Sequence, residues 1–199
     1  ESLARMQLGE LLAGVADLER LANRLVTERI TPRELQHLGR SLATLPRIAE
    51  LLDQRPELAT LVTFPDLQPV AELVARALVD DPPVTLGQGA VIRPGFAPEL
   101  DGLRSRAHAA REWIASLEQR ERERTGIRSL KVGYNKVFGY YIEVSHANRH
   151  LVPDDYQRKQ TLVGAERYIT PELKEYEQLV LHAEERIAAL ETDVYRRVV

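Results

Sequence analysis

The sequence contains no cysteine and no hydrophobic run that approaches the length of a membrane span. Without cysteine there is neither a disulfide framework nor a thiol nucleophile, and a reducing compartment is compatible with the chain. A transmembrane helix needs about 20 consecutive apolar residues, and the N-terminus has no signal-peptide pattern. We therefore expect a soluble protein with no membrane partner.

Recognisable catalytic motifs are also missing. No Walker-type phosphate-binding loop occurs, so the chain should not hydrolyse ATP by itself. His146 and His150 are followed by Asp154 at a spacing that could imitate metal ligands. They fall at a strand end and in a loop rather than on a helix face, which favours exposed loop residues over a metal site. We expect no enzyme activity, no catalytic residue, no metal and no cofactor in these 199 residues.

Apolar residues at alternating steps of three and four predict two long helices of matching period. The first has its apolar seam at Leu100–Leu117 and ends near Gly126, a residue suited to a helix C-terminus. The second begins with Thr170 as N-cap and Pro171 in the first turn, and its seam runs over Leu173–Val194. Helices of this length reach about 40 Å, so an antiparallel pair would form an arm.

The stretch 129–169 between these helices predicts a small antiparallel sheet. Residues 130–135 and 140–145 alternate apolar and polar side chains, and an Asn-Lys-Val-Phe-Gly connection joins them as a β-hairpin. Residues 157–169 are rich in β-branched and aromatic side chains, which predicts a third strand with a bulge at Gly164. The predicted fold is mainly α with a small antiparallel β tip (α+β): a helical bundle followed by a long two-helix arm that holds the sheet.

The preceding residues predict the helical bundle. Residues 6–26 have the pattern of one long amphipathic helix, and a capping box at Thr31 begins another, which Pro46 interrupts. A further helix starts at about Asp66 or Pro69. Residues 84–92, surrounded by proline and glycine, predict a small hairpin.

Positive charge is concentrated in the predicted tip. Residues 127–168 contain seven basic and four acidic side chains, a net charge of +3, whereas the whole chain has 27 basic and 30 acidic side chains, a net charge of −3. A basic tip on an acidic body attracts polyanions such as nucleic acid to the tip alone. The candidate contacts with phosphate are Lys131, Lys136, Arg158 and Lys159, and Asn135 and Thr161 complete the predicted DNA-backbone set. The alternative is ordinary solubilising charge on edge strands.

Two further groups have competing interpretations. The tyrosines of the tip, Tyr134, Tyr140, Tyr141 and Tyr168, could stack on bases, but packing on the buried face of a small sheet is favoured. The run Arg120–Arg124 alternates in sign and is interpreted as a solvated helix face with weak ion pairs.

The run TGIRSLKVGYNKVFGYYIEVSHAN, followed by YQRKQTLVGAERYITPELKEYE, closely resembles the clamp region of bacterial DNA mismatch-recognition proteins of the MutS family. Less specifically, ITPRELQHLGRSL and the stretch from DDPPV to AVIRPGF resemble the core and lever helices that precede the clamp. The resemblance implies a core and lever helical region at 1–94, a clamp arm and β tip at 95–170 with its sheet at about 129–169, and a returning lever helix at 171–199. We expect the chain to be an excised piece of a longer protein.

For the parent protein, the resemblance implies a dimeric DNA-dependent ATPase that uses ATP and Mg²⁺ and encircles duplex DNA. This chain would contribute the lever and clamp, contacting the DNA backbone non-specifically and relaying ATP-driven movement. The implied partners are double-stranded DNA, a second copy in a homodimer and downstream mismatch repair factors, in the bacterial cytoplasm at the nucleoid. Where relatives often have Lys-Asn, this chain has Val163-Gly164, which shifts the predicted phosphate contact toward Arg158 and Lys159. The alternative function is a coiled-coil protein-interaction arm.

Overall fold

The computed structural model describes residues 2–54, 62 and 64–199, which fall into two compact units. The first contains residues 1–98 and 188–199, and the second contains residues 99–187. In the described part of the chain, no helix is both long enough and apolar enough to cross a membrane. The predicted division into core, clamp and returning lever refers to function, and it stays a prediction.

Helices and a small antiparallel sheet make up the chain, which confirms the predicted fold class. In chain order, the elements are α1 (Ser2–Ala13), α2 (Leu18–Val26), α3 (Pro32–Asp53), α5 (Gln68–Ala77), α6 (Pro98–Thr125), β1 (Lys131–Asn135), β2 (Gly139–Ser145), the 3-10 helix η1 (His146–Leu151), β3 (Gln157–Thr161), β4 (Ala165–Ile169) and α7 (Pro171–Val198).

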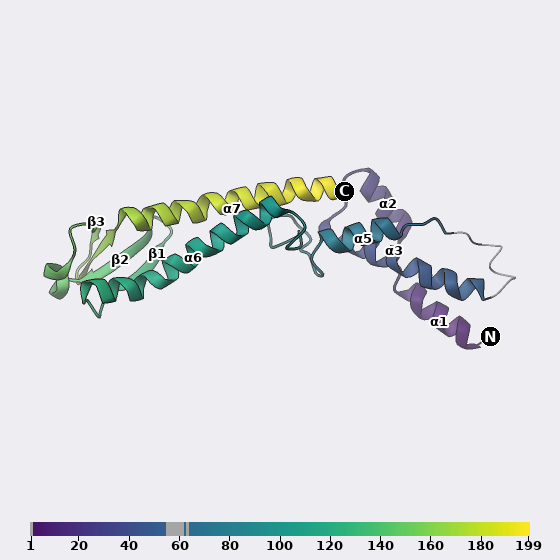
Figure 1. Ribbon diagram of the computed structural model, residues 1–199, viewed down its shortest axis with the longest axis horizontal. Coiled ribbons are helices and arrows are strands. Elements are labelled where there is room, and N and C mark those ends of the chain that lie inside the picture. The colour runs from purple at the N-terminus through teal and green to yellow at the C-terminus, as the bar shows by residue number, and fades with distance from the viewer. Residues whose placement is uncertain (1, 55–61, 63) are drawn as a thin grey trace. The chain divides into compact units, whose positions relative to one another are not determined.

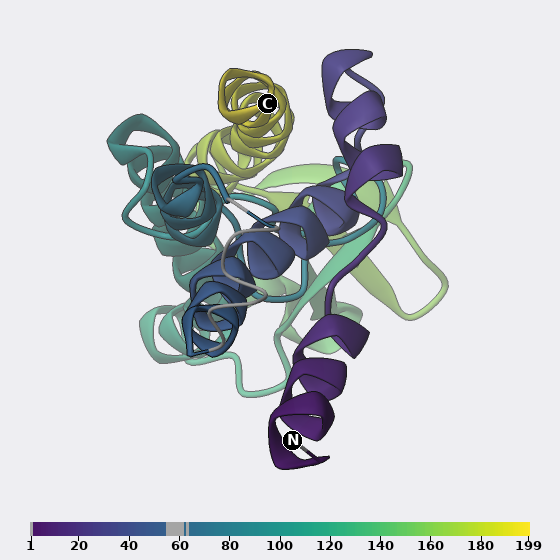
Figure 2. The same ribbon diagram turned by 90° about the vertical axis from the view of Figure 1, so that its right-hand side faces the viewer.

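The N-terminal residues of the first unit form two helices rather than the single long helix predicted over residues 6–26. The chain leaves α1 after Ala13, and α2 begins with Asp17 as its N-cap, whose carboxylate accepts a hydrogen bond from the Arg20 N–H at 2.9 Å. Figure 2 shows α1 and α2 running away from each other on either side of the short connection. The apolar spacing was right for each helix, but a local N-cap divides them.

Helix α3 begins as predicted and ends later than predicted. The Thr31 side chain accepts a hydrogen bond from the Glu34 N–H, and the Glu34 carboxylate accepts one from the Thr31 N–H, which completes the capping box. The helix continues through Pro46 to Asp53, so the predicted interruption at Pro46 is wrong. Buried Leu42, Leu45 and Ile48 lie on both sides of the proline, and their packing outweighs the backbone hydrogen bond that proline cannot donate.

The predicted hairpin over residues 84–92 is also wrong. These residues form bends and turns, and the pairing that the structure describes in this region joins Leu78 to Ile92 instead. The Val79 N–H donates to the Val91 carbonyl at 3.0 Å, and the Arg93 N–H donates to the Ala77 carbonyl at 2.8 Å. The buried Glu191 carboxylate of α7 accepts the Val91 and Ile92 N–H groups at 2.9 and 3.0 Å. Residues 91–93 therefore pair with residues 77–79, at and just after the end of α5.

In the second unit, α6 and α7 are antiparallel, and the sheet lies where α6 ends and α7 begins (Figure 1). Both predicted ends are confirmed: Gly126 has a φ of 73° directly after α6, and the Thr170 hydroxyl caps α7 by accepting the Leu173 N–H at 3.0 Å. The predicted seam of α6 is buried throughout, at Leu100, Leu103, Ala107, Ala110, Ile114 and Leu117. Trp113 of α6 stacks on Tyr176 of α7 with ring centroids 3.9 Å apart.

The sheet has four strands in the order β1-β2-β4-β3, with all neighbours antiparallel. The predicted β1–β2 hairpin is confirmed, whereas the single third strand over residues 157–169 is wrong. That stretch is a second hairpin, in which Gly164 lies in the turn and the irregularity in pairing lies between Arg158 and Gln160. Ile142, Val144 and Tyr168 from the central strands β2 and β4 pack into a core shared with α6 and α7. The helices thereby cover one face of the sheet.

The alternating run Arg120–Arg124 is more than the solvated face predicted for it. Glu121 is buried and accepts hydrogen bonds from Arg124 at 2.7 Å and from the Tyr156 hydroxyl at 2.6 Å. Arg124 also pairs with Asp155 at 3.1 Å. Burial, and then the Glu121 carboxylate, raise the pKa of Tyr156 well above its usual range. This network ties the end of α6 to the segment that precedes β3.

Candidate nucleic-acid interface

The β1–β2 turn presents Lys136 to solvent. Asn135 shapes this turn, because its side-chain oxygen accepts a hydrogen bond from the Val137 N–H at 2.7 Å. Gly139 closes the turn with a φ of 76°, a backbone conformation that L-residues with a side chain rarely adopt. Lys136 is exposed between them. The predicted roles of Lys136 and Asn135 thus fall on one turn, with Asn135 also serving as a structural residue.

Glu177 of α7 holds this turn against the helix. Its carboxylate is buried and accepts the Tyr140 N–H at 2.9 Å. A methyl group at Gly139 would lie 1.8 Å from the same carboxylate, so only glycine leaves room for this contact. A second carboxylate acts on β1, where Glu118 of α6 accepts the Val132 N–H at 2.9 Å. Two helical carboxylates therefore fix the hairpin that positions Lys131 and Lys136.

The predicted cations lie along the sheet rather than in one cluster. Lys131 pairs in register with Glu143, Glu143 with Arg167, and Arg167 with Gln160, so these positions form one row across the four strands. Lys131 lies at one edge of the sheet, on β1. Gln160 ends the row at the other edge, on β3, and Lys159 directly precedes it at the irregularity between Arg158 and Gln160. Three strand spacings separate the edges by about 14 Å. Thr161 lies toward the β3–β4 turn, at the opposite end of the sheet from Lys136.

At the centre of the row, the positive charge of Arg167 is neutralised by a neighbouring carboxylate on the sheet. Arg167 pairs with Glu143 at 2.9 Å, donates to Gln160 at 3.1 Å, and lies 4.1 Å above the ring of Tyr141. Its side chain is only 20% exposed. Because its donors are directed to neighbours on the sheet, Arg167 stiffens this surface more than it offers charge to a ligand.

Arg158 is close to a carboxylate but still partly exposed to solvent. It lies 3.6 Å from the carboxylate of Glu166, which Arg149 also approaches at 3.5 Å. Glu166 is buried and accepts a hydrogen bond from the Tyr168 hydroxyl at 2.5 Å. This hydroxyl first, and then the guanidinium groups of Arg149 and Arg158, hold the pKa of Glu166 below its usual range even though burial acts in the opposite direction. Arg158 remains 54% exposed.

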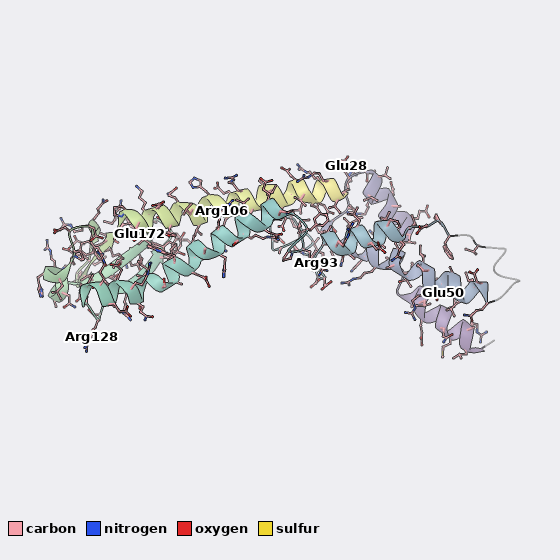
Figure 3. The ribbon with its side chains drawn as sticks, viewed as in Figure 1. Glu28, Glu50, Arg93, Arg106, Arg128 and Glu172 are labelled. Carbon is pink, nitrogen blue, oxygen red and sulfur yellow. The ribbon has the colours of Figure 1, made fainter. Side chains whose placement is uncertain are left out.

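Four of the seven basic side chains of residues 127–168 make no ion pair with any residue that the structure describes. They are Arg128, Lys131, Lys136 and Lys159, and all four are exposed. Arg128 was counted in the predicted tip charge but not in the predicted contact set. It lies in the turn between α6 and β1, and Figure 3 shows its side chain projecting away from the ribbon. The sequence signal for this exposure was the place of Arg128 in the connection that follows Gly126, the residue at the end of the helix.

The tyrosines of the tip differ in burial. Tyr168 is buried in the core, as the favoured packing interpretation requires. Tyr134 is 55% exposed and contacts Tyr140 with ring centroids 5.0 Å apart. Both rings border a groove of about 650 Å³ between α6 and the β1–β2 hairpin.

His146, at the other end of β2, lies 3.0 Å from the Leu162 carbonyl through its Nε2 atom.

Comparison with known proteins places this sequence among DNA mismatch repair relatives. Residues 95–186, which include α6 and all four strands, match the family described as MutS family domain IV. The whole chain is 52% identical over 201 residues to the DNA mismatch repair protein MutS of Dehalococcoides mccartyi (strain ATCC BAA-2266 / KCTC 15142 / 195). This chain belongs to the MutS family.

Other MutS relatives give the same result. Identity is 45% over 205 residues with the DNA mismatch repair protein MutS of Methanosarcina acetivorans, and the alignment includes 100% of this chain. It is 52% over 192 residues with that of Shouchella clausii, with 94% of this chain included. The chain spans 23% of the D. mccartyi and M. acetivorans relatives and 22% of the S. clausii relative. The predicted family is confirmed, and the match covers both compact units.

Proposed function

We propose that this chain is the lever and clamp region of a DNA mismatch repair protein and that its sheet contacts the backbone of duplex DNA. The observation that supports this best is a set of exposed cations, Arg128, Lys131, Lys136 and Lys159, that make no ion pair with the described residues of a chain whose net charge is −3. Such an arrangement directs a polyanion to the sheet and away from the rest of the surface. Arg158, Asn135 and Thr161 supply further donors.

Contacts of this kind are to phosphate and sugar, so they position DNA without reading its sequence. The edges of the sheet are about 14 Å apart, and phosphates along one DNA strand repeat about every 3.4 Å of helix axis. The cations can therefore reach several phosphates of one backbone. Mismatch reading would belong to other parts of the parent protein.

The parent protein would be a DNA-dependent ATPase that binds ATP and Mg²⁺ outside these residues and acts as a homodimer with downstream repair factors at the bacterial nucleoid. In that setting the helices of this chain would relay ATP-driven movement to the sheet. Helix α7 suits this role because it is a single helix whose residues 171–187 belong to one compact unit and whose later residues belong to the other. A helix transmits displacement along its axis because its backbone hydrogen bonds are internal.

A protein-interaction arm is the second candidate. Val137 and Phe138 in the β1–β2 turn are 81% and 50% exposed, next to Lys136. Exposed apolar residues at a loop tip are a common feature of protein-binding surfaces. This candidate predicts that replacing Val137 and Phe138 by serine abolishes a stable protein complex that survives nuclease treatment.

Charge reversal tests the DNA-binding proposal. In a full-length mismatch repair protein with this region, Lys131→Glu, Lys136→Glu, Arg158→Glu and Lys159→Glu together should weaken binding to a fluorescent homoduplex. The loss should be about a hundredfold or more, and the slope of log affinity against log salt should fall by about 3.6, because each of the four phosphate contacts contributes about 0.9 to that slope.

The matched control reverses charge elsewhere in the same unit. Lys174 and Arg186 of α7 are exposed and have no ion pair with the residues described. Reversing both should change the slope by less than one unit. An unchanged affinity of the quadruple variant at low salt would contradict the proposal.

A further inference from the structure

Glu166 is a buried carboxylate at the centre of a three-charge cluster. Its side chain on β4 is 3% exposed, and one oxygen accepts the hydrogen bond from the Tyr168 hydroxyl. The other oxygen lies 3.5 Å from Arg149, on η1, and 3.6 Å from Arg158, on β3. A buried carboxylate needs a counter-charge, because an unpaired ion away from water is costly.

The cluster has one more positive charge than its carboxylate can neutralise. Arg149 and Arg158 both remain largely exposed, at 61% and 54% of their side chains, and their pairing distances exceed the 2.7–2.9 Å typical of a tight charge-assisted hydrogen bond. By contrast, Arg167 pairs with Glu143 at 2.9 Å and is 20% exposed. The two guanidinium groups on Glu166 are therefore held loosely enough to turn toward an external anion.

Removing Arg149 would change the role of Arg158. Among the side chains that the structure describes, Arg158 would then be the sole guanidinium partner of Glu166, and the pair would have no net charge. A guanidinium that is the sole counter-ion of a buried carboxylate stays close to it, because moving away would leave the buried charge unpaired. The availability of Arg158 to a phosphate thus depends on a residue of another element.

We propose that Arg149 is a positioning residue for DNA binding: by sharing the charge of Glu166, it leaves Arg158 free to contact a backbone phosphate. This inference rests on the proposed DNA contact of the sheet. Arg149 acts through Glu166, and the ligand of Arg158 is a phosphodiester of duplex DNA.

The test compares four variants of a full-length mismatch repair protein with this region, using a fluorescent homoduplex at pH 8. Arg149→Ala and Arg158→Ala should each weaken binding by about tenfold, as expected for one lost charge-assisted contact. Glu166→Gln should bind at least as tightly as the unmodified protein. The double variant Arg149→Ala/Glu166→Gln should recover most of the affinity that Arg149→Ala loses.

The decisive result is that Arg149→Ala costs far less affinity when it is combined with Glu166→Gln than when it is made alone, because the cost of losing a direct contact between Arg149 and DNA would be the same in both backgrounds. The inference would be overturned by Arg149→Ala binding normally, by Arg158→Ala binding normally, or by a double variant as weak as Arg149→Ala. Arg186→Ala, which removes a charge from exposed α7, is the matched control and should bind normally. Failure of the broader DNA-binding proposal is seen separately, since Lys131→Glu/Lys136→Glu would then also bind normally.

Discussion

Gly139 fixes the β1–β2 turn at the scale of a single residue. Its φ of 76° and the 1.8 Å that would separate an added methyl group from the Glu177 carboxylate both disfavour any other residue. Glu177 in turn satisfies the Tyr140 N–H. The exposure of Lys136 therefore depends on a glycine three residues away and on a helical carboxylate.

Gly139→Ala should lower the free energy of unfolding by about 2 kcal/mol, which combines left-handed backbone strain with a weakened hydrogen bond to Glu177. Urea unfolding of the 199-residue chain, followed by the fluorescence of its single tryptophan in α6, measures this. Gly164→Ala is the matched control: Gly164 has no positive φ and an added methyl group would meet nothing within 4 Å. Equal effects of the two substitutions would contradict this account of the turn.

At the residue scale, sequence patterns predicted which charged side chains are exposed better than they predicted which side chains pair with one another. Lys131, Lys136 and Lys159 are exposed as expected, because charge on turns and edge strands is rarely covered. The link between Arg158, Arg149 and Glu166 could not be predicted, because it joins β3, η1 and β4 and depends on strand order. The burial of Glu121 could not be predicted either, because its partner Tyr156 lies 35 residues away in the sequence.

At the scale of elements, the start of α3 is a charged junction with α2. Glu34 accepts hydrogen bonds from Arg20 at 3.0 Å and Arg24 at 2.8 Å while it completes the capping box with Thr31. Burial acts to raise the pKa of Glu34, but the Thr31 N–H, Arg20 and Arg24 outweigh it and lower the pKa from 4.5 to about 2. The carboxylate therefore stabilises the folded state in its ionised form.

Because the pKa of Glu34 is lower in the folded than in the unfolded state, its contribution is present above about pH 4.5 and is lost as the pH falls toward 2. We expect protection of α2 and α3 amides in hydrogen exchange to decrease over that range, by about 2 kcal/mol after allowance for solvent screening. Glu34→Gln should flatten this part of the pH dependence. Glu50→Gln, on the exposed face of the same helix (Figure 3), should leave it unchanged; a steep decrease that persists in Glu34→Gln would refute the assignment.

The start of α7 gives a second prediction for an element. Thr170→Ala removes the cap of the Leu173 N–H and should destabilise the second unit by about 1 kcal/mol. Thr170→Ser keeps the hydroxyl and should recover most of the loss. Tryptophan fluorescence in urea again provides the measurement, and an alanine variant as stable as the serine variant would show that the cap is unimportant.

Element types were predictable where one local pattern was sufficient. The seams of α6 and α7, their ends at Gly126 and Thr170 and the β1–β2 hairpin all follow from spacing and turn chemistry. Errors occurred where packing or pairing overrode the local signal. Helix α3 passes through Pro46, and a tight turn at Val163-Gly164 divides one predicted strand into two.

At the scale of the whole molecule, a buried scaffold supports an exposed basic surface. Helices α6 and α7 share a core with the sheet, and the face that they leave uncovered includes the row from Lys131 to Gln160. The chain belongs to the MutS family, and the relatives that it matches are DNA mismatch repair proteins. Contact with the DNA backbone remains the central proposal.

The most direct test is a cryo-EM structure of a full-length mismatch repair protein with this region, bound to duplex DNA. The account predicts nitrogen-to-oxygen distances of about 2.7–2.9 Å between DNA phosphates and at least two of the side chains Arg128, Lys131, Lys136, Arg158 and Lys159. It also predicts no contact from these side chains to base edges. A closed complex in which the sheet is far from the DNA, or in which these side chains contact protein instead, would contradict it.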